Sequence, residues 1–147
     1  MYYMVVEQTK EYKNRVVYDP LTNSFSESSH ACLFSVREFP HAYGWLKESG
    51  TPPEEHLDVF LMSHFDCALG DEILVKIIGV FIRNDGDHKL VSVLPERHEN
   101  DFFMLSESEI NDLYKLYPRI DEGEGWFGAE KANEVIHAFM LNGREVH

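Results

Sequence analysis

Apolar residues in the middle of the chain predict a β-rich scaffold. Residues 72–83 form the longest apolar run, and both faces of a strand in this run are apolar: Ile73, Val75, Ile77 and Phe81 on one, Leu74, Ile78, Val80 and Ile82 on the other. Such a strand is buried on both sides, as in a sheet that is covered or closed on itself. The segment Asn84–Asp87 is a hairpin signal leading into a strand over 89–94, and a shorter apolar strand is predicted over 57–62.

The first third of the chain also predicts strands. Residues 12–19 and 24–38 are rich in Val, Phe and Ser, and they flank a turn at Asp19–Asn23. This arrangement predicts a hairpin. Two proline-containing breaks, Phe39-Pro40 and Pro52-Pro53, then predict that residues 40–56 form a loop.

The last third predicts two helices. Ser106 and Glu109 have the spacing of a capping box, and the apolar stripe that follows ends before a proline: Ile110, Leu113, Tyr114 and Tyr117. A second helix is predicted from about Gly128 to a stop at Asn142-Gly143, with one apolar face: Ala132, Val135, Ile136, Phe139 and Met140. Strands followed by helices predict a single α+β domain over 1–147, with an antiparallel sheet or small barrel flanked by the two helices.

The composition and net charge of the chain exclude some classes of function. The chain has 147 residues, of which 44% are hydrophobic and 13% aromatic, enough for a packed core. A net charge of −13 opposes binding to nucleic acid or to an anionic membrane surface. No apolar run approaches the ~18 residues of a membrane span, and Met1–Glu7 is too short and too soon acidic for a signal peptide, so we expect a cytoplasmic protein. Cys32 and Cys67 are most simply reduced thiols, with one disulfide as the alternative.

Two acidic clusters adjoin the predicted strands. Asp85 and Asp87 can share a hard cation, and Lys89 two residues on can meet phosphate charge from the same side. Glu55 and Asp58 lie at the entry of the strand over 57–62, where side chains from neighbouring strands converge. An acidic hairpin turn and a solvated loop are the structural alternatives. The chain contains no phosphate-loop, dinucleotide, serine-hydrolase or zinc motif.

Four segments in this order resemble motifs of the soluble, metal-dependent inorganic pyrophosphatases. Phe39–Gly44 is similar to the family's Y-P-x-x-Y-G, and Glu55–Val59 is similar to the end of its D-G-D-P-x-D-V. Ile78–Val80 followed by Asp87–Val91 is similar to its G-V strand and D-x-K-L-V. Glu124–Ala132 is similar to its E-G-W-x-x-A-x-x-A. The resemblance extends over about 110 residues.

This resemblance implies a fold, an activity and a set of site residues. The expected fold is a mainly antiparallel, five-stranded OB-like barrel with two C-terminal helices. The expected activity is Mg²⁺-dependent hydrolysis of pyrophosphate by a metal-activated water, with Mn²⁺ or Co²⁺ as other possible metals, in a homo-oligomer. The residues carried over are as follows: Asp58, Lys89 and Tyr43 as catalytic groups; Arg15, Tyr43, Lys89 and Tyr117 as substrate ligands; Asp58, Asp85, Asp87 and Glu55 as metal ligands.

The chain departs from the family pattern at several charged positions. Pro53 stands for the first aspartate of D-G-D-P-x-D, Val17 for a carboxylate, Ala31 for an arginine and Pro118 for a lysine. Arg15 replaces a lysine. These replacements keep two further functions open: hydrolysis of another phosphoanhydride or phosphoester, and a non-catalytic binding or assembly module on the same scaffold.

Overall fold

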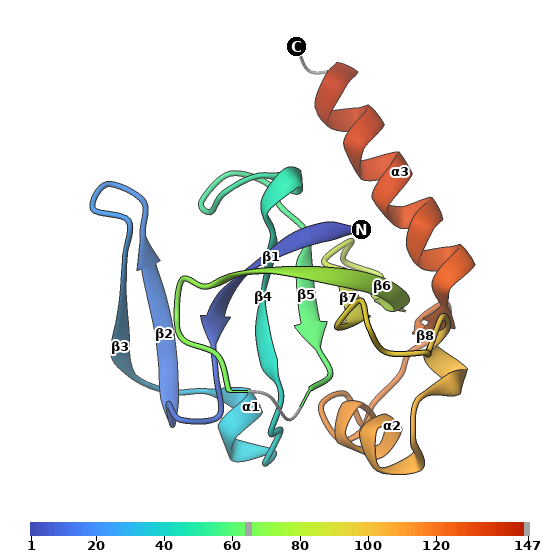
Figure 1. Cartoon of the computed structure of the whole chain (residues 1–147), viewed down its shortest axis with the longest axis horizontal. Coiled ribbons are helices and arrows are strands. Elements are labelled where there is room, and N and C mark those ends of the chain that lie inside the picture. Colours follow the sequence, from blue (N-terminus) through green and yellow to red (C-terminus); the bar gives the residue numbers. More distant parts are fainter. Residues whose placement is uncertain (64–65, 146–147) are drawn as a thin grey trace.

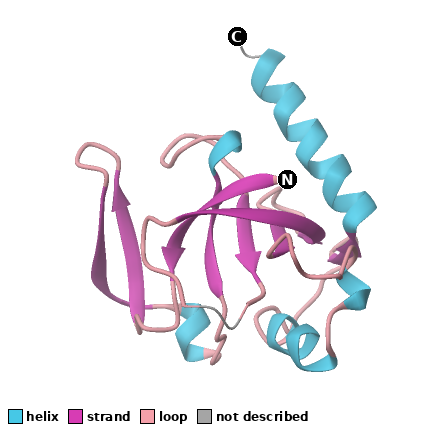
Figure 2. Ribbon diagram, viewed as in Figure 1, coloured by secondary structure: helices cyan, strands magenta, loops and turns pink. Residues whose placement is uncertain are grey.

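The computed structural model describes residues 1–63 and 66–145, with side chains up to Leu141 (Figures 1 and 2). Its strands are β1 Tyr2–Gln8, β2 Asn14–Asp19, β3 Ser24–Ala31, β4 Ala42–Leu46, β5 Asp58–Leu61, β6 Glu72–Ile82, β7 Lys89–Val93 and β8 Gly125–Gly128. Its α-helices are α1 Leu33–Val36, α2 Glu107–Tyr114 and α3 Ala129–Glu145, and two 3-10 turns cover Lys47–Ser49 and Phe102–Met104.

Five strands close into a barrel. The order in the sheet is β1-β4-β5-β7-β6, and β1 also pairs with β6, so the first and last strands of the series meet. All pairs in this ring are antiparallel except β5 with β7, which is parallel. The expected mainly antiparallel, five-stranded barrel with C-terminal helices, in an α+β chain, is therefore confirmed. Strand β8 pairs antiparallel with the last residues of β6, from Gly79 to Ile82.

Strand β6 is apolar on both sides because it separates two clusters of buried side chains. Val75, Ile77 and Val80 belong to the cluster under α3, whereas Ile78 and Phe81 belong to the cluster under α2. The pairing of β6 with β7 shifts between Ile77 and Gly79, and such a bulge exchanges the two faces of a strand. The predicted assignment of Phe81 and Ile77 to one face is wrong for this reason, although burial on both sides is confirmed.

The two C-terminal helices pack on the barrel through the apolar faces predicted from the sequence. The capping box of α2 forms, since the Ser106 hydroxyl accepts from the Glu109 amide and the Glu109 carboxylate accepts from the Ser106 amide. The apolar face of α3 packs on the barrel strands, and the helix then extends beyond the barrel (Figure 1). The predicted stop at 142–143 is wrong, because α3 continues to Glu145.

A separate two-stranded hairpin, β2–β3, stands beside the barrel and confirms the predicted turn at Asp19–Asn23 (Figure 1). Its aromatic side chains Tyr18 and Phe25 pack on Trp45 of β4, with ring centroids 5.1 and 6.2 Å away. The prediction of strand through residue 38 is wrong, because β3 ends at Ala31 and the short helix α1 follows.

Two further elements differ from expectation. Strand β4 crosses the segment 40–56 that was predicted to be a loop, because Pro40 precedes the strand and Pro52 follows it. Strand β1 was not predicted, although Met4 and Val6 are fully buried in it. Cys32 and Cys67 are both free, as expected for reduced thiols. Within the described ranges 1–63 and 66–145, no helix is long and apolar enough to cross a membrane.

Candidate active site

The pairing of β5 with β7 brings the two predicted clusters together. Asp58 and Lys89 are register partners in this parallel pair, so their side chains lie on the same face of the sheet. The Lys89 Nζ donates to Asp58 Oδ2 at 2.6 Å, and both side chains are about nine-tenths buried. Asp87, two residues before Lys89, accepts from the same Nζ at 3.1 Å. Three residues from the two predicted clusters, Asp58 from one and Asp87 and Lys89 from the other, therefore meet at one point.

Tyr43 of β4 joins this group from the neighbouring strand. Its hydroxyl accepts a hydrogen bond from Lys89 Nζ at 3.0 Å and donates one to Asp58. Its ring packs between Phe34 and Phe60, with centroids 4.7 and 5.1 Å away, which fixes the direction of the hydroxyl. Burial, and then the negative charge of Asp58, raise the pKa of Tyr43 well above its usual value, so the phenol stays protonated and can donate to an oxyanion.

Opposite charges keep the central pair ionised despite its burial. Burial alone would raise the pKa of Asp58, but hydrogen bonds from His56 and Lys89 and the Lys89 charge hold that pKa at about 2. Burial alone would lower the pKa of Lys89, but Asp58 and then Asp87 raise it. The site therefore presents a carboxylate and an ammonium at neutral pH, which suits a ligand that is itself charged.

Glu7 on β1 belongs to the same group, and the sequence analysis missed it. Burial, followed by repulsion from Asp58, raises the pKa of Glu7 to about 7, while His56, Lys89 and Arg15 act in the opposite direction. The available signal was a single carboxylate within the otherwise uncharged run Tyr2–Gln8. Without the closure of β1 onto β4, nothing in the sequence connects Glu7 to Asp58.

His56 was noted only as a member of the acidic cluster, yet it contacts Asp58 directly. The His56 Nε2 lies 3.1 Å from Asp58 Oδ1, and the His56 Nδ1 lies 2.8 Å from the carbonyl oxygen of Glu54. A hydrogen bond to each acceptor requires both ring nitrogens to carry a proton, and the Asp58 hydrogen bond raises the pKa of His56. Both oxygens of Asp58 therefore face a cationic group.

The hairpin tip between β6 and β7 directs Asp85 away from this point. The Asp87 amide donates to Asp85 Oδ1 at 2.9 Å, an Asx turn, and Asp85 Oδ2 lies 3.4 Å from Arg83. The Arg83 guanidinium also lies 3.8 Å from Asp87 and 5.6 Å from the centre of the Tyr117 ring. Arg83, which the sequence analysis did not select, thus links Tyr117 to the aspartates.

Two predicted site residues lie further out. Glu55 is exposed in the segment before β5, and Arg15 is exposed on β2, where its charge still lowers the pKa of Glu7. The four uncharged replacements also lie at the periphery: Pro53 before β5, Val17 on β2, Ala31 at the end of β3 and Pro118 after α2. Across residues 1–63 and 66–145, no three His, Cys, Asp or Glu side chains form a group that could hold a metal ion by themselves.

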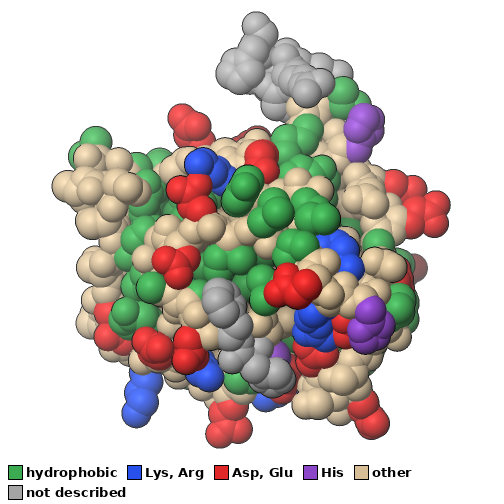
Figure 3. Space-filling model, in the orientation of Figure 1, with side chains coloured by type: hydrophobic (Ala, Val, Ile, Leu, Met, Phe, Trp, Pro, Cys, Tyr) green, Lys and Arg blue, Asp and Glu red, His purple; other side chains and the backbone are tan. Residues whose placement is uncertain are grey.

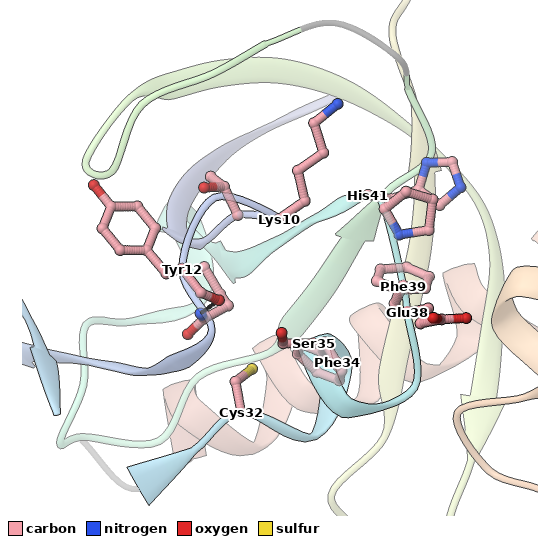
Figure 4. A pocket seen from close by; sticks show the side chains of 11 residues that line it. Lys10, Tyr12, Cys32, Phe34, Ser35, Glu38, Phe39 and His41 are labelled. Atoms are coloured by element: carbon pink, nitrogen blue, oxygen red, sulfur yellow. Dashed lines mark hydrogen bonds between the residues drawn. The ribbon is translucent and has the colours of Figure 1, made fainter. Parts of the chain in front are cut away.

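The cavities around the site lie on two sides of it. A cavity of about 210 Å³ is lined by α1 and the segments 8–12 and 38–41, and it contains none of the predicted site residues (Figure 4). Phe34 in its wall contacts Tyr43, so this cavity lies behind the tyrosine. A second cavity of about 440 Å³ includes His56 and Asp87 in its lining and opens beside α3.

The fold and this group of side chains define a small β-barrel protein with a compact carboxylate–lysine–tyrosine cluster. The chain belongs to the inorganic pyrophosphatase family, because the family model of that description matches residues 4–143.

Two known inorganic pyrophosphatases and one crystal structure of a third are similar to the chain. The inorganic pyrophosphatase of Leifsonia xyli is 25% identical over 125 residues, which cover 75% of this chain and 77% of that protein. The inorganic pyrophosphatase of Malacoplasma penetrans is 27% identical over 121 residues, covering 78% of this chain and 66% of that protein. The crystal structure of an inorganic pyrophosphatase from Neisseria gonorrhoeae superimposes with a TM-score of 0.73 at 20% identity, covering 95% of this chain and 89% of that chain. This last likeness shows the fold.

Proposed function

We propose that the protein hydrolyses inorganic pyrophosphate to two phosphates with the help of a divalent cation, Mg²⁺ first and Mn²⁺ or Co²⁺ as alternatives. The observation that carries the proposal is the meeting of Asp58, Asp87 and Tyr43 at the Nζ of Lys89, in a chain that belongs to the inorganic pyrophosphatase family. The overall negative charge, seen in the many acidic side chains of Figure 3, is compatible with an anionic substrate only where cations offset it.

The residues present fit a cation that is held partly by the chain and partly by the substrate. Oxygens of Asp58 and Asp87 lie within 2.6 and 3.1 Å of one ammonium nitrogen, so both carboxylates can reach a single cation. Mg²⁺ commonly takes one or two carboxylates together with substrate phosphates and water, so a group of three carboxylates is not required. A cation there would supply water activation and neutralisation of phosphate charge. Asp85 and Glu55 remain candidates for further ligands.

The chain's own groups have separate tasks in this proposal. Asp58, ionised through its low pKa, orients the attacking water by accepting its hydrogen bond. Lys89 and Tyr43 donate to phosphate oxygens, and Tyr117, Arg83 and the more distant Arg15 add donors around them. The water oxygen bonds to one phosphorus as the bridging P–O bond breaks, and the second phosphate leaves with that bridging oxygen.

A second candidate is a binding module, or a hydrolase of another phosphoanhydride. It is favoured by the loss of charge at Pro53, Val17, Ala31 and Pro118, and by the pairing of both Asp58 oxygens with Lys89 and His56. These features remove some of the charged groups that the family pattern places around pyrophosphate.

Phosphate release from pyrophosphate by four proteins separates the candidates: wild type, Asp58→Asn, Asp87→Asn and the control Asp66→Asn. We expect Mg²⁺-dependent release by the wild type and the control, since the Asp66 side chain is 83% exposed and lies 3.9 Å from Lys10. Loss of a charged group that acts in the transition state costs about 10²–10³-fold, and we expect that decrease in kcat for both site variants. Unchanged rates in both variants would refute the assigned roles, and circular dichroism checks that each variant is folded.

A further inference from the structure

The cavity of about 440 Å³ beside α3 extends the site on one side. We call it the α3 groove, with an apolar floor of Leu57, Val135, Ala138 and Phe139 and polar lining residues His56, Asp87, His88, Lys131 and Glu134. A cavity of this volume is in the range of small-molecule sites, which are commonly apolar with a few polar groups at one end. Pyrophosphate has no apolar part, so the proposed reaction leaves the floor of the groove unused.

His56 and Asp87 connect the groove to the carboxylate–lysine cluster around the ends of two strands. Successive side chains of a strand point to opposite faces, so Leu57 faces the α3 side while Asp58 faces Lys89. His56 and Asp87 serve both places: each contacts the central pair, at 3.1 Å from Asp58 Oδ1 and 3.1 Å from Lys89 Nζ, and each lines the groove. His56 precedes β5 and Asp87 precedes β7, so the groove begins directly beside Asp58 and Lys89.

The lining of the groove combines polar side chains near the cluster with apolar side chains along α3. His56 and His88 lie in its lining, together with Lys131 and Glu134 of α3, whose charged groups are 3.5 Å apart. His56 thus contacts the cluster at one end of the groove, whereas Val135, Ala138 and Phe139 continue along α3. An apolar chain or an aromatic ring attached to the inner phosphate would contact these three side chains and be removed from water.

We propose that this site accepts organic diphosphates, with the terminal phosphate at Lys89 and the apolar or aromatic alcohol portion in the α3 groove. The inference rests on the proposed function and defines its substrate class. In the reaction, the oxygen of a water molecule bonds to the terminal phosphorus, and the bridging P–O bond breaks. The bridging oxygen leaves with the organic monophosphate, and the water proton is released to solvent. The products are one organic monophosphate and one phosphate.

The test compares pyrophosphate, ADP and geranyl diphosphate as substrates for three proteins in Mg²⁺. Ala138→Trp fills the groove from an exposed helical position, and Asn133→Trp places the same side chain at an exposed position on the same helix outside the groove. We expect Ala138→Trp to lower the ratio of kcat/KM for the organic diphosphate to that for pyrophosphate by tenfold or more. Asn133→Trp should leave the ratio within twofold of the wild type.

Binding of a methylene-bridged analogue of the better organic substrate, measured by calorimetry, gives a readout that does not need turnover, and Ala138→Trp should weaken it tenfold. If pyrophosphate is hydrolysed but neither organic diphosphate is hydrolysed or bound, the substrate class is refuted and the proposed function stands. If Ala138→Trp leaves the ratio and the binding unchanged, the placement in the groove is refuted. If no substrate is hydrolysed, the proposed function and this inference both fail.

Discussion

Replacement of Glu7 by Gln should stabilise the protein at neutral and alkaline pH. In the folded state, burial and the neighbouring Asp58 raise the pKa of Glu7 from 4.5 to about 7, so its ionised form is disfavoured on folding. The stability associated with protonated Glu7 is fully present below pH 4.5 and is lost as the pH rises through 7. At about 1.4 kcal/mol for each pKa unit, the loss amounts to roughly 3 kcal/mol by pH 8. Gln cannot ionise and should not show this loss.

The assay is urea unfolding of wild type and Glu7→Gln between pH 4.5 and 8, in chelator. We expect the free energy of unfolding of the variant, relative to wild type, to rise by roughly 3 kcal/mol across this range. Titrating groups that do not interact with Glu7 are common to both proteins and cancel in the difference. Glu11→Gln, which changes an exposed carboxylate, is the matched control. Its free energy of unfolding should follow that of the wild type across the pH range. Parallel profiles for Glu7→Gln would refute the burial of Glu7 and its repulsion by Asp58.

Three further substitutions test the packing that supports the site. Phe60→Ala removes a fully buried ring that contacts Phe34, Phe39 and Tyr43, and should cost about 3–5 kcal/mol in urea unfolding; a loss under 1 kcal/mol would contradict this packing. Arg97→Met removes the guanidinium that pairs with the buried carboxylates of Glu99 and Glu109 and should cost about 3–5 kcal/mol in the same measurement, whereas an unchanged midpoint would contradict these ion pairs. Gly44→Ala would place a Cβ 1.8 Å from the carbonyl oxygen of Val5, so we expect loss of the cooperative thermal transition, and a normal melt would disprove this close approach of β4 to β1.

Elements with one dominant local signal were predictable from the sequence. The capping box at Ser106 and the turn at Asp19–Asn23 are set by residues within a few positions of each other. The two-sided burial of 72–82 follows from its composition, but the bulge between Ile77 and Gly79 depends on pairing with a distant strand. Strand β1 was missed because packing against the rest of the fold outweighs local signals.

The sequence predicted the site residues that belong to short local motifs. It missed the residues that come close to the site only through closure of the barrel. Tyr43, Asp58, Asp87 and Lys89 were selected from two clusters and one aromatic motif, and the structure places them around one nitrogen atom. Glu7 lies 51 positions before Asp58 in the chain, and its part in the site depends on closure of the barrel.

Phosphate release by the wild-type protein is the measurement that tests the central claim most directly. Pyrophosphate is supplied with Mg²⁺, Mn²⁺ or Co²⁺ in turn, and each reaction is repeated with excess chelator. The proposed function predicts release of two phosphates for each pyrophosphate consumed, in a reaction that stops when the cation is removed. Absence of release with all three cations would contradict it, and the group around Lys89 would then be a binding site without this chemistry.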